Sequence, residues 1–319
     1  MRVVFFGSPE FAVPSLRAIA ERHDVVAVVS QPDRPAGRGG KLQPPAVKVL
    51  AGDLGLRTLQ PTKLRDGTLA RELAALAPDV FVVVAYGRIL PPDLLAVPRL
   101  GPWNVHASLL PKFRGAAPIQ WSIVRGEQET GVAIMRLEEG LDTGDVAAVL
   151  RESIRPDDTA GSLSARLSTL GAQLVVETLP AIEQGTVILA KQDDAQATFA
   201  PPLSKADGQL VFTDAAEVVS ARARGVDPWP GATLLLQGEV AKVFGPAVVE
   251  GTGRPGEVLG LRSQGLAIAC GSGVIAFAEI QLPGRKRMPA KALLAGHPIP
   301  PGAMVGAVRI RLWKEPKND

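Results

Sequence analysis

The sequence has a single cysteine, Cys270, among its 319 residues. One cysteine cannot form a disulfide within the chain and cannot supply a cysteine metal cluster, so the sequence is typical of a reducing compartment. Cys270 ends the apolar run Leu266–Cys270, where a small buried side chain is expected in place of a reactive thiol. The sequence therefore gives no support to a cysteine nucleophile.

Histidine is almost as scarce, with only His23, His106 and His297. None has a second histidine at the spacing of a zinc-binding helix, so we expect no metal cofactor. Apolar runs long enough to span a membrane are also lacking, and the first residues carry neither a cleavage-site pattern nor an Arg/Ser-rich presequence. We expect a cytoplasmic protein without a membrane partner. We also expect a monomer, because no exposed apolar stripe stands out.

Aromatic residues make up only 4% of the chain, so Val, Leu, Ile and Ala must form the core. The net charge is only +3, and the excess falls after residue 206, where there are 13 basic and 10 acidic residues. A polyanionic partner would explain this excess, and an ordinary solvated surface explains it equally well. The length suits two domains better than one core.

The first half of the chain alternates apolar strands with helices. Strands are expected at Arg2–Phe6, Val25–Val29, Val80–Ala85 and Gly101–His106, and helices at 8–20, 46–54 and 68–77. Continuous apolar strands separated by helices indicate a mostly parallel sheet that is covered on both faces. Residues 31–45, rich in Pro and Gly, are expected to form a long loop.

The pattern changes further along the chain. Residues 131–154 indicate two strands joined by a loop at Gly140–Asp145, and 159–183 one long helix. Beyond residue 208, short strand-like pieces separated by Gly-rich turns indicate a small β-barrel, for which an OB-like topology is one possibility. We therefore expect a catalytic domain at 1–188, a linker at 189–207 and a barrel domain at 208–319.

Two common phosphate-binding motifs are absent. A dinucleotide fingerprint needs G-x-G-x-x-G after the first strand, but Pro9 stands at the second glycine after Gly7. A phosphate-binding P-loop needs a glycine five positions before the Gly-Lys pair and Ser or Thr after it, whereas Gly40-Lys41 has Pro35 and Leu42 there. These departures weigh against a nicotinamide enzyme and an NTPase.

The polar residues at the strand ends carry more information. Asn104 and His106 are two positions apart at the end of a strand, so their side chains point to the same face. Ligands of open α/β sheets lie beyond the carboxyl ends of parallel strands, where Tyr86-Gly87 ends another strand. These ends are expected to converge on one crevice.

Histidine can relay protons near neutral pH, and an asparagine amide can donate to a developing oxyanion. A carboxylate beside the histidine would orient it and favour its charged form. Asp142, between Gly140 and Gly144, is the natural candidate, with Asp145 as its competitor. A lone histidine is nevertheless more often structural, and an aspartate between glycines is more often a turn residue.

Several segments resemble the formyltransferase family that uses 10-formyltetrahydrofolate. They are, in the expected order and with similar spacing, Gln31–Gly39, Val82–Gly87, Asn104–Gln120, Leu141–Asp145, Leu203–Lys205 and Pro228–Pro230. The resemblance covers essentially the whole chain. It implies a Rossmann-like catalytic domain and a smaller C-terminal OB-like domain that contacts tRNA.

The resemblance also implies the reaction, formyl transfer to the α-amino group of methionine esterified to initiator tRNA, for translation initiation. The amine must lose a proton, the oxyanion needs a donor and the leaving nitrogen needs a proton. Within the family pattern, Asn104 is implied as the oxyanion donor, His106 as the proton relay and Asp142 as the group that orients and charges His106.

The residues implied to bind the folate lie on three loops: Tyr86, Gly87, Ile89, Leu90, Ser108, Leu109, Leu110, Pro111, Arg114 and Leu141. The resemblance further implies a cis peptide bond at Leu110-Pro111, which is rare enough to be informative.

Basic residues on three segments are implied to contact tRNA: Arg34, Arg38, Lys41, Lys48, Lys205, Arg285, Lys286 and Arg287. The loop 33–48 resembles an insertion that reaches the tRNA acceptor end, and phosphate contacts would make its affinity dependent on salt. Gly40 stands where the family pattern has a lysine, which puts one such contact in doubt. A flexible loop at 33–48 and a solvated turn at 285–287 are the alternatives.

Three rival functions remain open from the sequence. A formyltransferase acting on a ribonucleotide amine or an amino sugar, or a formyl-folate hydrolase, would share Asn104, His106 and Asp142. A tRNA-binding module without chemistry would tolerate loss of His106. Transfer to charged initiator tRNA is the test that separates them.

Overall fold

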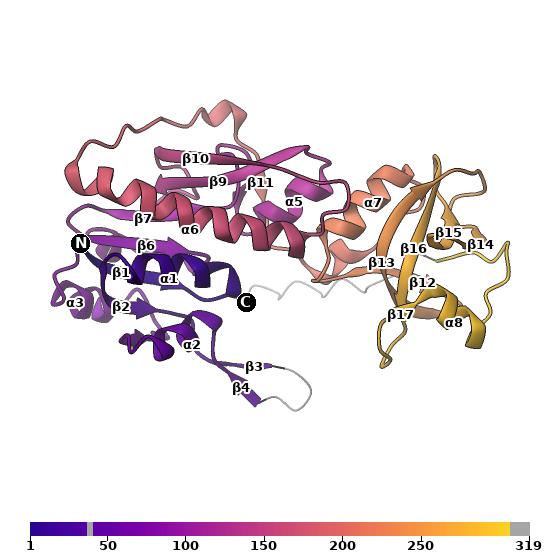
Figure 1. The fold of residues 1–319 in the computed structure, drawn as a ribbon, viewed down its shortest axis with the longest axis horizontal. Coiled ribbons are helices and arrows are strands. Elements are labelled where there is room, and N and C mark those ends of the chain that lie inside the picture. The colour runs from indigo at the N-terminus through magenta and orange to yellow at the C-terminus, as the bar shows by residue number, and fades with distance from the viewer. Residues whose placement is uncertain (37–40, 307–319) are drawn as a thin grey trace, which may run out of the picture. The chain divides into compact units, whose positions relative to one another are not determined.

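The computed structural model describes residues 1–36 and 41–306, and the chain divides into two compact units (Figure 1). The first unit contains 1–119, 128–154 and 162–202, and the second contains 120–127, 155–161 and the residues from 203 onward. The chain therefore passes between the units more than once, and no single position separates them. Within the described residues, no helix is long and apolar enough to cross a membrane.

The first unit is built on a seven-stranded sheet with the order β10-β9-β7-β6-β1-β2-β5. Its strands are β1 (Arg2–Gly7), β2 (Asp24–Val29), β5 (Thr58–Leu59), β6 (Val80–Val84), β7 (Pro102–His106), β9 (Glu129–Arg136) and β10 (Val146–Ser153). The strands from β7 to β5 are parallel, whereas β9 is antiparallel to β7 and β10 is antiparallel to β9. The predicted mostly parallel sheet is confirmed.

Helices cover both faces of this sheet, as the continuous apolar strands require. They are α1 (Val13–Ala20), α2 (Ala46–Asp53), α3 (Thr68–Ala74), α4 (Pro92–Leu95) and α6 (Ala160–Gln184), with the short 3-10 helix η1 (Glu10–Ala12) before α1. Most of α5 (Pro118–Val124) belongs to the second unit. Phe6 and Phe81 pack in one core cluster with Leu73 of α3 and Leu94 of α4. On the α6 side, Gly171 lies so close to Val105 that an added Cβ would be 2.8 Å from its Cγ1.

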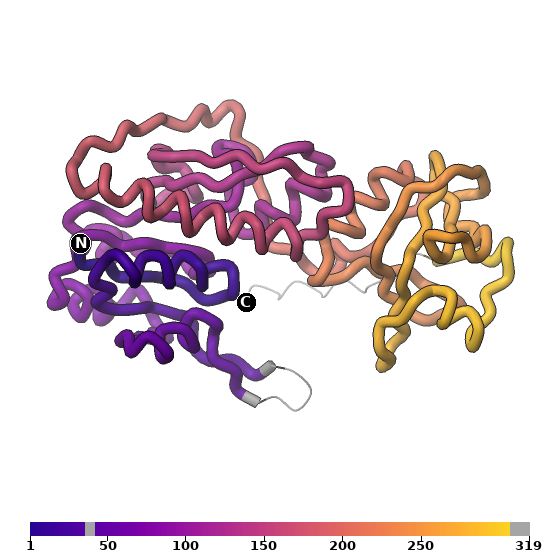
Figure 2. The backbone as a smooth tube through the Cα atoms, viewed as in Figure 1, coloured from indigo at the N-terminus to yellow at the C-terminus, as the bar shows by residue number. Residues whose placement is uncertain are grey.

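The segment predicted as the loop 31–45 contains a short antiparallel hairpin, so that prediction was wrong in part. Its strands are β3 (Arg34–Ala36) and β4 (Lys41–Gln43), whose backbones run side by side in Figure 2. Arg34 pairs with Gln43. Two three-residue strands that pair with each other carry no apolar periodicity, which explains why the sequence did not indicate them. Arg38 and the side chain of Lys41 lie outside the described residues.

The segment expected as a linker bonds to the first unit along part of its length. Ala190 forms a β-bridge with Val146, and β11 (Phe199–Ala200) pairs in parallel with β8 (Arg114–Gly115). The 3-10 helix η2 (Asp194–Gln196) lies between these contacts. Backbone pairing of this kind needs no apolar side chains, so composition alone gave it no signal.

The second unit contains an antiparallel sheet with the order β12-β13-β16-β15-β14, and β17 pairs with β16. The strands are β12 (Ala232–Leu236), β13 (Glu239–Val249), β14 (Val258–Arg262), β15 (Gly265–Ala269), β16 (Val274–Gln281) and β17 (Met288–Pro289). Gly306 bonds to Leu235 of β12 in both directions, and Met304 forms a bridge with Glu257 beside β14. Residues 303–306 thus join the two edge strands and close the sheet.

The second unit has an apolar core, to which side chains from two helices that the sequence analysis missed contribute. They are α7 (Ala216–Gly225) and α8 (Ala290–Gly296), with the 3-10 helix η3 (Lys205–Gly208) before them. Cys270 belongs to this core, and burial raises the pKa of its thiol to about 11. The prediction of a packing residue in place of a nucleophile fits this position, because the thiolate is the reactive form.

Candidate active site

Asn104 is the third and His106 the last residue of β7, which lies between β6 and β9 in the sheet. Their spacing of two places both side chains on the same face, as predicted. The His106 side chain is only 5% exposed, whereas Asn104 is half-buried. Among the described residues, the Asn104 amide has no side-chain hydrogen-bond partner, so its donors are available to a ligand.

The histidine ring is oriented by a backbone carbonyl. Its Nε2 lies 3.0 Å from the carbonyl oxygen of Phe113. A carbonyl only accepts hydrogen bonds, so Nε2 carries a proton and donates it. Phe113 is itself in the left-handed region, with φ of +60°, and its N–H donates to Thr198 Oγ1 at 2.9 Å. Nδ1 is therefore the nitrogen of neutral His106 that has a free lone pair.

Asp142 comes to His106 from the opposite end of β7. The antiparallel strand β9 ends with Arg136 beside Trp103, and Leu137 bonds to Pro102. The loop that follows returns so that Asp142 Oδ2 lies 3.7 Å from His106 Nδ1. This distance exceeds a hydrogen bond but lets the carboxylate stabilise a charged imidazole.

The Asp142 carboxylate is fixed by a stronger contact. The Gly115 N–H donates to Oδ2 at 2.7 Å, and only 12% of the Asp142 side chain is exposed. Gly115 has φ of +119°, and an added Cβ would lie 2.8 Å from the Ala200 carbonyl oxygen, so no other residue fits there without a shift. Asp142 rather than Asp145 faces the histidine.

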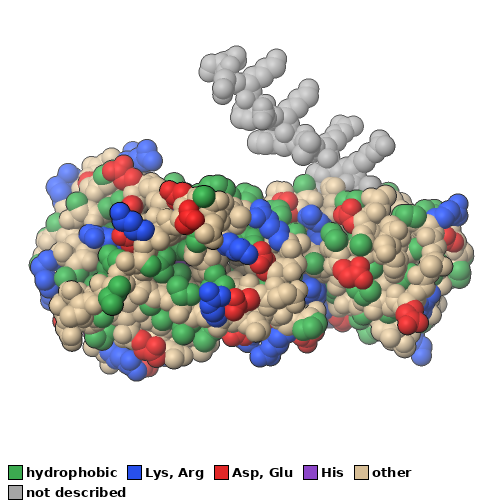
Figure 3. All heavy atoms as spheres, turned by 90° about the horizontal axis from the view of Figure 1, so that it is seen from above, with side chains coloured by type: hydrophobic (Ala, Val, Ile, Leu, Met, Phe, Trp, Pro, Cys, Tyr) green, Lys and Arg blue, Asp and Glu red, His purple; other side chains and the backbone are tan. Residues whose placement is uncertain are grey.

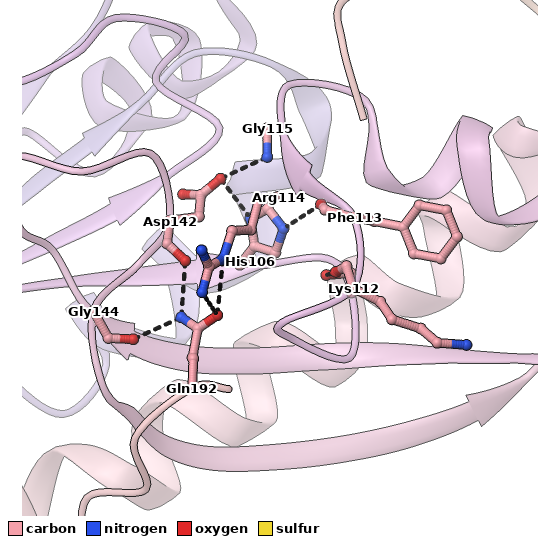
Figure 4. A network of polar contacts seen from close by, with 9 residues as sticks. His106, Lys112, Phe113, Arg114, Gly115, Asp142, Gly144 and Gln192 are labelled. Carbon is pink, nitrogen blue, oxygen red and sulfur yellow. Dashed lines mark hydrogen bonds and ion pairs between the residues drawn. The ribbon is translucent and has the colours of Figure 1, made fainter. Parts of the chain in front are cut away.

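A partly buried polar network supports the Asp142 loop (Figure 4). Gln192 Nε2 donates to the carbonyl oxygens of Asp142 and Gly144, at 2.8 and 2.7 Å. Its Oε1 accepts from Nε and Nη2 of Arg114, at 3.1 and 2.9 Å, and the same guanidinium pairs with Asp194 at 2.7 Å. Sequence analysis missed Gln192 and Asp194, because nothing in the spacing of the segment 189–207 pointed to the site.

The residues predicted to bind folate fall into three groups by exposure. Ile89 and Leu141 are 71% and 53% exposed, unusually high values for large apolar side chains, and Gly87 is also exposed. They follow β6 and β9 in loops. An apolar ligand surface could cover Ile89 and Leu141 at a gain of roughly 25 cal/mol per Å² of apolar area buried.

Four other predicted folate residues have buried side chains with other roles. Tyr86 and Leu90 belong to the core cluster of the first unit, and burial raises the pKa of the Tyr86 hydroxyl. Ser108 Oγ donates to the Lys112 carbonyl at 2.6 Å, and Arg114 is committed to the network of Gln192. These side chains shape the loops and do not present a surface to a ligand.

The remaining predicted folate residues are half-buried on the loop between β7 and β8. Leu109 packs against Gly131, where an added Cβ would lie 2.5 Å from Leu109 Cδ2. Leu110 packs against the small cluster that includes Met135. The Leu110-Pro111 peptide bond is cis, and the prediction for that bond is confirmed.

The basic residues predicted to contact tRNA differ in how many hydrogen bonds their side chains already make within the protein. Lys48 Nζ binds both carboxylate oxygens of Asp33, at 2.9 and 2.8 Å, and Gln60 Oε1 at 2.8 Å. Arg34 donates to Gln31 Oε1 at 2.5 Å. Lys48 and Arg34 therefore hold the base of the β3–β4 hairpin, and Lys205 is exposed.

In the second unit, Arg287 pairs with Glu279 and stacks on Phe244, with 4.0 Å from its guanidinium carbon to the ring centroid. Arg285 and Lys286 are exposed, and neither side chain has an ion-pair partner in the described part of the chain. On the face drawn in Figure 3, basic and acidic side chains are interspersed.

Within 1–36 and 41–306, no group of His, Cys, Asp and Glu could hold a metal ion.

Comparison with known proteins relates both units to one family. Residues 1–179 match the family described as formyl transferase, and residues 202–298 match the formyl transferase C-terminal domain. The chain is 47% identical to the methionyl-tRNA formyltransferase of Citrifermentans bemidjiense over 307 residues, which cover 96% of each chain.

Solved structures share the fold at lower identity. HypX from Aquifex aeolicus, crystallised with tetrahydrofolic acid, has a TM-score of 0.62 at 20% identity over 92% of this chain and 47% of its own. WlaRD, a sugar 3N-formyl transferase crystallised with dTDP and 5-N-formyl-THF, has a TM-score of 0.66 at 17% identity over 90% of this chain and 99% of its own. At these identities the likeness concerns the fold alone.

Proposed function

This chain belongs to the formyl transferase family, and from that membership we propose that it transfers a formyl group from 10-formyltetrahydrofolate to the α-amino group of methionine on initiator tRNA. The observation that carries the proposal is the 47% identity to a methionyl-tRNA formyltransferase along 96% of both chains. Identity of this extent includes both units, so it covers the tRNA-contacting part as well as the catalytic part.

The polar groups of the site suit the proton transfers of this reaction. The amine nitrogen forms a bond to the formyl carbon and loses a proton, and the nitrogen of the folate leaves and gains one. His106 relays these protons through Nδ1, because Nε2 donates to the Phe113 carbonyl. The imidazolium that forms faces Asp142 Oδ2 at 3.7 Å, which stabilises its charge.

Asn104 supplies the donor for the oxyanion. A tetrahedral intermediate carries negative charge on the former formyl oxygen, and a positioned amide donor is worth roughly 3 kcal/mol in such a site. The Asn104 amide is half-buried at the same end of β7 as His106, and no described side chain competes for its donors. It therefore needs no rearrangement before it acts.

The folate is held by the loops that follow β6 and β9. Ile89 and Leu141 offer exposed apolar surface to the ring of the pterin, and the exposed Gly87 lets the ligand approach the backbone. Arg34, Lys205, Arg285 and Lys286 supply phosphate contacts of the tRNA, together with Arg38 and Lys41.

The test is formyl transfer from 10-formyltetrahydrofolate to methionine charged on initiator tRNA, beside charged elongator tRNA and free methionine. We expect transfer to the initiator species alone. Folate consumption without a formylated product would point to a hydrolase. Intact folate with no transfer to any tRNA would overturn the tRNA assignment and direct the search to small amines.

A further inference from the structure

We propose that Gln192 is a positioning residue that holds Asp142 in place for His106; the proposal rests on the proposed function, because it assigns Asp142 a role in formyl transfer. Gln192 lies 50 residues beyond Asp142 in a segment without a recognisable motif. Its carboxamide bonds to Arg114 on one side and to the loop of Asp142 on the other.

The orientation of this carboxamide is determined by Arg114. A guanidinium has donors only, so the oxygen of Gln192 must face it, and Oε1 indeed accepts from Nε and Nη2 of Arg114. The Arg114 side chain is only 5% exposed, and Asp194 binds its Nη2 at 2.7 Å. The NH₂ group of Gln192 is therefore turned toward the Asp142 loop.

Both N–H groups of Gln192 have acceptors in that loop. They reach the carbonyl oxygens of Asp142 and Gly144 at 2.8 and 2.7 Å. Asp142 has φ of +52°, which L residues seldom adopt and which persists only where the surroundings hold it. Gln192 thus fixes the backbone on both sides of Thr143, and with it the direction of the Asp142 side chain.

The same segment also holds the carboxylate. Phe199–Ala200 pair with Arg114–Gly115, and the N–H of Gly115 donates to Asp142 Oδ2 at 2.7 Å. The stretch from Gln192 to Ala200 therefore fixes Asp142 at two points, at its carbonyl and at its carboxylate. Oδ2 is the oxygen that faces His106 Nδ1.

Gln192→Glu is the sharpest substitution, because it keeps the size of the side chain and its acceptor for Arg114. It removes both donors and sets a carboxylate oxygen against two carbonyl oxygens. We expect kcat for formyl transfer to fall about 10- to 100-fold, since a small misplacement of a catalytic group can cost that much. The KM values for 10-formyltetrahydrofolate and charged initiator tRNA should stay within about 2-fold, because the carboxamide of Gln192 is used by Arg114 and the Asp142 loop and is not among the groups proposed to bind substrate.

Gln196→Glu is the matched control. Gln196 lies four positions further on, is exposed, and donates only to Asp193 among the contacts described. It should leave kcat within about 2-fold of the unsubstituted protein. Gln192→Glu should also lose most of its effect when Asp142 is already Asn, because two groups that act as a unit are not additive.

Three outcomes overturn the proposal. Gln192→Glu raises either KM at constant kcat, or it leaves kcat unchanged, or it lowers kcat by the same factor whether position 142 is Asp or Asn. If Gln192→Glu does not melt cooperatively, Asp194→Asn replaces it, because Asp194 is 81% exposed. That variant should lower kcat a few-fold with KM unchanged, and unchanged kcat would then overturn the proposal. Formyl transfer by the unsubstituted protein is measured first, so that failure of the proposed function is seen separately.

Discussion

At the scale of single residues, His106 has both ring nitrogens engaged in different ways. Nε2 is fixed by the Phe113 carbonyl, whereas Nδ1 faces a carboxylate beyond hydrogen-bond distance. The first contact orients the ring, and the second leaves Nδ1 able to take up a proton. The proposed proton relay uses Nδ1, the ring nitrogen that no hydrogen bond occupies.

His106→Gln should abolish turnover and preserve folding. Glutamine can still donate to the Phe113 carbonyl, but it cannot accept a proton, so we expect kcat to fall about 10²- to 10⁴-fold. Single-turnover formylation and thermal unfolding measure the two effects. His297→Gln, in the second unit and half-buried, is the control that should keep full activity. A His106 variant that transfers formyl groups at the normal rate would exclude the proton-relay role.

Asn104 and His106 could be predicted from the sequence because strands have a period of two and parallel strands end at one edge. Asp142 could not be placed in this way, since β9 runs antiparallel and ends at the far side of β7. Its place between Gly140 and Gly144 made it a candidate beside Asp145, and the resemblance to the family then favoured Asp142. Gln192 had no signal at all, because in the sequence a glutamine that bonds to two carbonyls looks like any polar residue of a loop.

At the scale of elements, the β3–β4 hairpin is anchored by a compact polar cluster at its base. Lys48 and Gln60 both bond to the Asp33 carboxylate, and these bonds lower its pKa, with the Lys48 hydrogen bond as the largest cause. Gln60 also donates to the Gln31 carbonyl, and Gln31 Nε2 donates to the Tyr86 carbonyl at 2.9 Å. The hairpin is thus tied to the turn that precedes Ile89.

Lys48→Met should loosen the hairpin and leave the sheet intact. The variant keeps the length of the side chain but loses the ammonium group, so Asp33 loses its charged partner. We expect faster hydrogen exchange at Leu42 and Gln43, and a higher KM for charged initiator tRNA with little change in the KM for the folate. Lys63→Met, at an exposed lysine of the same unit, is the matched control. Unchanged exchange at the hairpin would exclude this anchoring role.

Acidification should have a related effect on the same cluster. The pKa of Asp33 is lower in the folded protein than in the unfolded chain, so its contribution to stability is present above the ordinary aspartate pKa. The contribution is lost as the pH falls through the folded pKa. The hairpin base is therefore anchored at neutral pH and released only in acid.

The elements that sequence analysis predicted are those with a strong hydrophobic pattern. β1 and β6 are buried on both faces, and α6 spans 25 residues with one apolar side. Among the elements that it missed, the strands β8 and β11 have two residues each and are defined by their partners. Pairing between distant short segments leaves no periodicity to read.

At the scale of the whole molecule, four of the 13 basic and two of the 10 acidic residues after residue 206 lie beyond residue 306, outside the described residues. Arg287 is neutralised by Glu279, and Lys48 by Asp33, so neither adds to a polyanion-binding surface. Arg285 and Lys286 are exposed, and neither has an ion-pair partner within residues 1–36 and 41–306. These two side chains, together with the exposed Lys205, are the candidates for phosphate contacts in the second unit.

Arg285→Ala with Lys286→Ala should weaken tRNA binding in a way that depends on salt. Each phosphate contact contributes a slope of roughly −0.9 to a plot of log K against log salt concentration. We expect the double variant to flatten this slope by about 1 to 2, while kcat at saturating tRNA is unchanged. Arg22→Ala, beside the amino end of β2 in the first unit, should leave the slope unaltered. An equal slope in the double variant would remove both residues from the interface.

Because residues 303–306 close the sheet of the second unit, that sheet can be completed only late in synthesis. Leu235 of β12 leaves the ribosome well before Gly306, the residue with which it exchanges two backbone hydrogen bonds. At about 5–20 residues per second, the delay amounts to several seconds. Throughout that interval β12 is an open edge that a neighbouring nascent chain could pair with. Gly306 is therefore among the residues that cover the edge of β12, and pairing of that edge with another chain is blocked only after they have been synthesised.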